Sequence, residues 1–154
     1  KFDFSDVVNN VTAKMIYRHP HVFADESADT PQDVSKSWEV LKKKEKGYNT
    51  KKDVLESIPN ALPALIKGDK TVSKATKLGL ENINLTDSIN NLEIELQKIK
   101  ENNISEKTEK EEIIGNCFLE LIRISKFFKQ NSEIALTNAI KTYINNLEGV
   151  DEQF

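Results

Sequence analysis

The sequence predicts an all-α protein, and two observations support that fold class. Apolar residues recur at spacings of three and four along most of the chain, which is the period of an amphipathic helix. No segment alternates apolar and polar residues with the period of two that is typical of a half-buried strand. The 154 residues are 38% hydrophobic and 31% charged, so there is enough apolar material for a core and the composition is not that of a disordered chain.

The first predicted helix carries apolar residues at helical spacing after Asp3 and Ser5, either of which can cap its beginning. It is expected to end near Arg18, because a proline two residues further on disfavours helical geometry at the residue between them. Residues 19–30 are then expected to form a loop.

The second predicted helix runs from 31 to about 46. Thr30 followed by a proline is a strong helix start, and Gly47 is a natural C-cap residue. Residues 47–60 read as a polar connector with room for one short helical turn.

Four more helices are predicted from the same signals, followed by a loose tail over 149–154. Gly79 should end the first of them, and Ser132 with Glu133 should begin the last. Gly68 is a weak point inside the first, since glycine is a poor helix former. The expected ranges are 61–78, 86–100, 109–129 and 132–147.

Short polar links between the last three helices favour an antiparallel helical bundle. The helix over 109–129 is apolar around much of its circumference, which is more surface than two neighbouring helices cover. We therefore expect a homodimer in which a second chain completes the bundle.

Composition excludes several classes of function. No apolar run is long enough to span a membrane, and we expect no signal peptide because no basic stretch is followed by an apolar segment. The single cysteine, Cys117, cannot form an internal disulfide, so a cytoplasmic location is expected. A net charge of −3 gives no general support for nucleic-acid binding.

Charge is nevertheless uneven along the chain. Seven lysines and two glutamates between Lys36 and Lys52 give +5, and four lysines and ten acids between Glu81 and Glu120 give −6. One interpretation is a pair of solvated helix faces, and the other is a cationic segment near an anionic helical pair that binds metal and polyphosphate.

Several sequence segments are distinctive: Phe2–Asn9, Arg18–Asp25 with its Arg-His-Pro-His-Val-Phe, Trp38–Lys46, Ile58–Leu65, Lys74–Leu80 and Ala135–Leu147. Together they closely resemble MazG-type nucleoside triphosphate pyrophosphohydrolases over nearly the whole chain. Proteins of this family contain two similar helical domains in tandem. The resemblance implies the end of an upstream domain over 1–30, a helical linker region over 31–80, and a C-terminal MazG-like helical domain over 81–148.

Enzymes of this family convert a nucleoside triphosphate and water to the monophosphate and pyrophosphate with the help of Mg²⁺. The family holds the metal with Glu-Glu-x-x-Glu on one helix and Glu-x-x-Asp on the next. Here the first motif aligns on residues 91–95, where only Glu95 keeps its acid, and the second aligns on 113–116, where Asn116 replaces the aspartate. Glu112 precedes a ligand position by one residue, which turns it roughly 100° around the helix.

By resemblance, the metal positions are therefore Glu95, Asn116 and Glu112, and weak or absent Mg²⁺ binding is expected. The family's phosphate-binding lysine and arginines align with Thr142, Asn145 and Asn146, none of which is charged. No catalytic residue is assigned. Two functions follow: a Mg²⁺-dependent pyrophosphohydrolase with a damaged site, or an inactive MazG-like domain that serves dimerisation or structural support.

Three other candidates have simpler explanations. His19 and His21 lack a third ligand nearby, so we expect them to stabilise a turn. Cys117 is expected to be a buried thiol, and Trp38 shares a helical stripe with apolar residues, which favours packing over base stacking.

Overall fold

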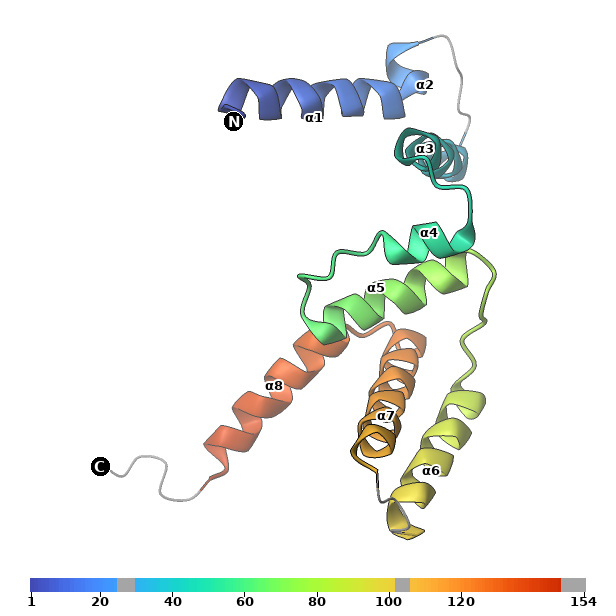
Figure 1. Cartoon of the computed structure of the whole chain (residues 1–154), viewed down its shortest axis with the longest axis vertical. Helices are drawn as coiled ribbons and strands as arrows, with labels where there is room; N and C mark the ends of the chain where they lie inside the picture. The colour runs from blue at the N-terminus through green and yellow to red at the C-terminus, as the bar shows by residue number, and fades with distance from the viewer. Residues whose placement is uncertain (25–29, 102–105, 148–154) are drawn as a thin grey trace, which may run out of the picture. The chain divides into compact units, whose positions relative to one another are not determined.

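The computed structural model describes residues 1–24, 30–101 and 106–147, and every regular element within these ranges is an α-helix (Figure 1). The all-α prediction is therefore confirmed. The chain divides into two compact units, one ending at Val54 and the other beginning at Leu55. The domain limits expected at 30, 80 and 148 stay a prediction.

The first unit begins with α1 (Phe4–Arg18), whose N-terminus is closed by a reciprocal capping box. The backbone N–H of Asp6 donates to the Asp3 carboxylate at 2.9 Å, and the N–H of Asp3 donates to the Asp6 carboxylate at 3.0 Å. The helix ends at Arg18, as the following His-Pro pair predicts.

A one-turn helix, α2 (Pro20–Phe23), follows directly. The prediction of a loop over 19–30 is wrong here, because Pro20 occupies the first position of the turn and its carbonyl accepts the N–H of Ala24 at 2.8 Å. Four residues are too few to show a hydrophobic period, so the sequence pattern gave no sign of this turn. The rest of the predicted loop, 25–29, lies outside the described residues.

Helix α3 (Pro31–Lys46) has both of its predicted ends. Thr30 accepts the N–H of Asp33 at 3.2 Å, and Gly47 adopts the left-handed conformation with φ 65°. The expected polar connector then contains α4 (Lys51–Glu56). The N–H groups of two preceding residues, Thr50 and Asn49, donate to the Asp53 carboxylate at 2.8 Å each and hold the pKa of Asp53 below its usual value.

The second unit opens with α5 (Ala64–Lys77), which begins three residues later than predicted. Pro63 occupies its N-cap position with extended geometry, so the apolar pattern reaches further upstream than the helix does. The helix ends before Gly79, which adopts the left-handed conformation with φ 64° as expected of a terminating glycine.

Three longer helices complete this unit: α6 (Leu85–Glu101), α7 (Lys107–Phe127) and α8 (Ser132–Asn145). Asn131 caps α8 by accepting the N–H of Ile134 at 3.0 Å. The prediction that Ser132 caps this helix is wrong by one residue, and its side chain is buried instead. Helices α6 and α7 lie side by side with the most extensive contact in the unit, and α5 packs across α7 (Figure 1).

A small apolar core lies where α5 and α7 meet. Gly68 on α5 faces Ile122 on α7 so closely that a Cβ at this glycine would lie 2.5 Å from the Ile122 Cδ1. Val72, Ile113 and Ile122 are almost fully buried. The glycine read as a weak point in the sequence is therefore a site of close helix contact.

Many large apolar side chains of this unit remain exposed. They include residues on three helices that keep between 40% and 66% of their surface: Ile89, Ile94, Ile99, Ile114, Phe118, Leu121, Ile140 and Tyr143. The expected antiparallel pair is present in α6 and α7, but much of the apolar surface of α7 and α8 has no cover within the described residues. No helix in the described ranges is both long enough and apolar enough to cross a membrane.

Candidate functional site

Helices α6 and α7 bring two amides and two carboxylates into facing positions. Asn91 and Glu95 are one turn apart on α6, and Asn116 and Glu120 are one turn apart on α7. Because the helices are antiparallel, Asn91 faces Glu120 and Asn116 faces Glu95. Each amide nitrogen lies 3.4 Å from the Oε1 of the carboxylate that it faces.

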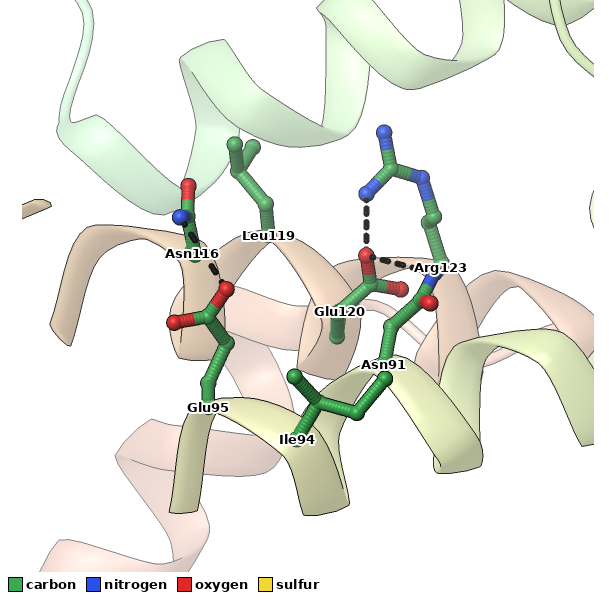
Figure 2. Close-up of a pocket in the computed structure, with 7 residues that line it drawn as sticks. All are labelled: Asn91, Ile94, Glu95, Asn116, Leu119, Glu120 and Arg123. Carbon is green, nitrogen blue, oxygen red and sulfur yellow. Dashed lines mark hydrogen bonds and ion pairs between the residues drawn. The ribbon is translucent and has the colours of Figure 1, made fainter. Parts of the chain in front are cut away.

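These four residues line a pocket of about 270 Å³ together with Ile94, Leu119 and Arg123. Figure 2 shows that the two amide–carboxylate pairs lie one after the other between the helices, with Ile94 and Leu119 beside them. Glu120 is almost entirely buried, and the Glu95 side chain keeps 13% of its surface. We call this set of seven residues the α6–α7 pocket.

Both carboxylates of the α6–α7 pocket already have a cationic partner. The Lys98 Nζ lies 3.0 and 3.1 Å from the two carboxylate oxygens of Glu95. A guanidinium nitrogen of Arg123 lies 2.8 Å from Glu120 Oε1. The same guanidinium donates to Glu81, which lies in the connector between α5 and α6.

The donor set does not fit a resident Mg²⁺ ion. Mg²⁺ needs near-octahedral oxygen ligands, usually carboxylates and waters. The two amides turn their nitrogen atoms toward the carboxylates, and the carboxylates are neutralised from within the chain. Among the described residues, no three histidine, cysteine, aspartate or glutamate side chains are grouped so that they could hold a metal.

The residues aligned with the metal motifs separate in space. Glu95 and Asn116 are brought together, as the alignment implies, and they share a hydrogen bond. Glu112 is exposed on α7 and does not line the α6–α7 pocket, which agrees with its offset of one residue.

The residues aligned with the phosphate-binding positions lie on or just after α8, outside the α6–α7 pocket. The Thr142 hydroxyl donates to the backbone carbonyl of Asn138 at 3.1 Å. Asn145 ends the helix and Asn146 is its C-cap residue. All three are exposed.

Two charged residues of the α6–α7 pocket, Glu120 and Arg123, were not predicted from the sequence. Both follow Asn116 at helical spacing, at four and seven residues, so they lie on the same face of α7. That spacing was the available signal. Arg123 and Glu120 pair with each other within α7. Their contacts with Asn91 on α6 and with Glu81 in the connector depend on packing that no local pattern in the sequence specifies.

The other candidates occupy structural positions. In the first unit, Trp38 is packed by two cations, with Arg18 Cζ at 5.3 Å and Lys42 Nζ at 4.6 Å from the ring centroid. His19 Nδ1 lies 2.7 Å from the carbonyl oxygen of Met15, at the end of α1. Cys117 is half-buried rather than fully buried.

The fold and the pocket define an all-α protein with a polar site between two antiparallel helices. Comparison with known proteins finds several relatives of this chain. A nucleoside triphosphate pyrophosphohydrolase of Escherichia coli K12 is 28% identical over 142 residues, which are 90% of this chain and 54% of that protein. The nucleoside triphosphate pyrophosphohydrolase/pyrophosphatase MazG of Thermotoga maritima is 28% identical over 151 residues, which are 98% of this chain and 56% of that protein.

A further relative, the uncharacterized protein YabN of Bacillus subtilis, is 42% identical over 69 residues, which are 45% of this chain and 14% of that protein. The resemblance to MazG-type proteins read from the motifs is thus confirmed over nearly the whole chain. The chain spans about half the length of the two pyrophosphohydrolases. No protein-family model and no solved structure matches it.

Proposed function

We propose that this chain is the C-terminal portion of a MazG-type nucleoside triphosphate pyrophosphohydrolase, and that its own α6–α7 pocket supports the helical assembly rather than catalysis. The names of the relatives support the enzyme class. The observation that supports the second part is the state of the pocket. Its carboxylates are paired with amides and with cations of the same chain.

The reaction of the whole protein is the hydrolysis of a nucleoside triphosphate to a monophosphate and pyrophosphate. Water attacks the α-phosphorus, and the bond to the bridging oxygen of the β-phosphate breaks, so pyrophosphate leaves with that oxygen. A triphosphate carries about four negative charges at neutral pH, which must be compensated before an anionic centre reacts. When bound, Mg²⁺ supplies that compensation.

This portion of the chain is poorly equipped for that task. Of the acids in the aligned motifs only Glu95 remains, and Lys98 neutralises it. Each carboxylate missing near Mg²⁺ removes on the order of 1–4 kcal/mol at a separation of about 4 Å with an effective permittivity between 80 and 20. Four missing carboxylates would lower the affinity by several orders of magnitude.

A role in dimerisation is supported by the exposed apolar surface. On α8, Leu136 and Ile140 keep 46% and 49% of their surface. Leu147, just after this helix, keeps 43%, and Phe118 on α7 keeps 49%. Large apolar side chains left exposed on neighbouring helices are typical of an interface with another chain. A second copy of the chain would bury it in a bundle of the kind predicted from the sequence.

The proposal is tested by measuring both properties on the same purified sample. Sedimentation equilibrium should give the mass of a dimer, and pyrophosphate release from a panel of nucleoside triphosphates with Mg²⁺ should stay at the background of a heat-denatured sample. A monomer at micromolar concentration would contradict the assembly role. Triphosphate hydrolysis that follows the protein through purification would contradict the inactive pocket.

A Mg²⁺-dependent pyrophosphohydrolase activity in this chain itself is the second candidate, and the names of the relatives favour it. In that case Glu95→Gln should abolish pyrophosphate release, because Glu95 is the one aligned acid that remains. Glu93→Gln is the matched control, since Glu93 is exposed on the same helix and outside the pocket. Equal activity of both variants would exclude catalysis at the α6–α7 pocket.

The proposed location is the cytoplasm, where the substrates of this class are found. It rests on the single cysteine of the chain, Cys117, which has no partner within it for a disulfide.

A further inference from the structure

Arg123 on α7 joins two carboxylates that come from different segments. One terminal nitrogen of its guanidinium donates to Glu120 Oε1 at 2.8 Å. The other terminal nitrogen and Nε donate to Glu81 Oε2 at 3.1 and 3.3 Å. The three side chains are mostly buried, with 28% of Arg123, 23% of Glu81 and 10% of Glu120 exposed.

The arginine at position 123 is unusual for this chain, in which most cationic residues are lysines. Of the 22 cationic residues in the chain only Arg18 and Arg123 are arginines. The other arginine also forms a cross-helix pair, with Arg18 Nε 2.7 Å from Glu45. Arginine presents a planar fork of five N–H donors that can bind two carboxylates at fixed angles, whereas the lysine ammonium is a compact point charge.

The guanidinium links three parts of the second unit. Glu81 belongs to the connector that follows α5, Glu120 belongs to α7, and Asn91 of α6 donates to the same Glu120 oxygen at 3.4 Å. Without a cation between them, two mostly buried carboxylates would repel each other and would leave their charges uncompensated. The connector and the α6–α7 pair are therefore held together by one positive charge.

We propose that Arg123 is the built-in cation of the α6–α7 pocket, and that it replaces a divalent metal as the charge that holds these carboxylates together. The inference rests on the contacts of Arg123 and not on whether the whole protein hydrolyses triphosphates. It explains how the mostly buried carboxylates of Glu81 and Glu120 lie beside one guanidinium without a bound metal. It also means that removing this guanidinium should create a site for a hard cation.

The oxygen atoms for such a site are present. The second carboxylate oxygens, Glu81 Oε1 and Glu120 Oε2, are buried and accept no hydrogen bond from the described residues. If Arg123 lost its charge, all four oxygens of the two carboxylates would lack a cation. Glu95 belongs to the neighbouring amide–carboxylate pair of the same pocket. Carboxylate oxygens are the ligands that Mg²⁺ and Mn²⁺ prefer in proteins.

The test compares three variants in thermal unfolding with EDTA and with millimolar Mg²⁺ or Mn²⁺. Arg123→Gln removes the charge and keeps a polar side chain. Lys126→Gln is the matched control, because Lys126 lies on the same helix, keeps a similar 21% exposure, and pairs with Asp69 at 2.8 Å. Arg123→Lys keeps the charge and removes the fork.

In EDTA, Arg123→Gln should melt at least about 5 °C below the parent chain and below Lys126→Gln. Addition of either divalent ion should recover part of that loss in Arg123→Gln and should not move the parent chain, Lys126→Gln or Arg123→Lys, since binding only to the native state raises the melting temperature. Arg123→Lys should melt between the parent chain and Arg123→Gln.

Two results would overturn the inference. One is a melting temperature of Arg123→Gln that matches Lys126→Gln and ignores divalent ions. The other is a parent chain that is itself stabilised by these ions as strongly as Arg123→Gln. If Arg123→Gln does not fold in EDTA, refolding it with millimolar Mg²⁺ or Mn²⁺ decides the question: a chain that stays unfolded with both ions would contradict the inference. Neither result depends on triphosphate hydrolysis, so this inference and the proposed function can be contradicted independently of each other.

Discussion

Restoring one acid to the α6–α7 pocket should make the stability of the chain depend on Mg²⁺. In Asn116→Asp, the amide nitrogen that lies 3.4 Å from Glu95 Oε1 is replaced by a carboxylate oxygen. The lost hydrogen bond costs about 1 kcal/mol. Repulsion between two unit charges at about 3.4 Å adds about 1 kcal/mol in water and about 5 kcal/mol at an effective permittivity of 20.

Lys98 offsets part of this repulsion, since its Nζ lies 3.0 Å from Glu95. We therefore expect a net loss of about 1–3 kcal/mol in the free energy of unfolding at neutral pH without metal. Two carboxylates at this distance raise the pKa of one of them. The destabilisation is therefore largest above that raised pKa. It decreases as the pH falls through this value, because one carboxylate takes up a proton and the repulsion disappears.

Urea unfolding with EDTA and with millimolar Mg²⁺, at neutral and at mildly acidic pH, measures these effects. Asn90→Asp is the matched control, because Asn90 is exposed on α6 and does not line the pocket. Mg²⁺ or acid should recover the lost stability of Asn116→Asp and leave the control unchanged. Equal stability of the two variants in EDTA would refute the reasoning that Asn116 stands against Glu95 at a former ligand position.

Two further predictions concern packing and pH. Gly68→Ala gains about 1 kcal/mol of helix propensity but loses about 1–3 kcal/mol to overpacking against Ile122, so it should destabilise the parent chain. In an Ile122→Val background the contacting methyl group is absent, so Gly68→Ala should stabilise the chain by up to about 1 kcal/mol. If the free-energy changes of the two substitutions simply add in urea unfolding, the close contact is refuted. The Arg18 hydrogen bond lowers the pKa of Glu45, so this pair contributes stability above the ordinary value of 4.5 and loses it as the pH falls through the lowered pKa. Arg18→Gln should return the pKa of Glu45 to near 4.5 in an NMR titration, and an unchanged pKa would mean that the pair is absent in solution.

Helix ends were predictable where a strong local signal marks them. Helix α3 runs from Pro31 to Lys46 as predicted, because Thr30 and Gly47 supply both caps with their own backbone and side-chain chemistry. The beginning of α5 was not, because the apolar pattern continues through residues 61–63 although Pro63 stands outside the helix. Periodicity records which side chains are apolar, and it does not record where the first helical hydrogen bond forms.

The site was predictable only to the extent that it follows from helical spacing and from the aligned motifs. These predicted that Glu95 and Asn116 lie at one site and that Glu112 points to another side of α7, as the structure has them. Arg123 pairs with Glu120 at local helical spacing, but it also pairs with Glu81, which comes from a distant connector. Long-range pairing of this kind is set by how the helices pack, which a single sequence does not specify.

The proposal for the α6–α7 pocket rests on the pairing of its two carboxylates with amides and cations of the same chain. Calorimetric titration of the folded chain with Mg²⁺ tests it most directly. We expect only the heat of dilution up to millimolar Mg²⁺. Saturable uptake at micromolar Mg²⁺ that disappears in Glu95→Gln would contradict it.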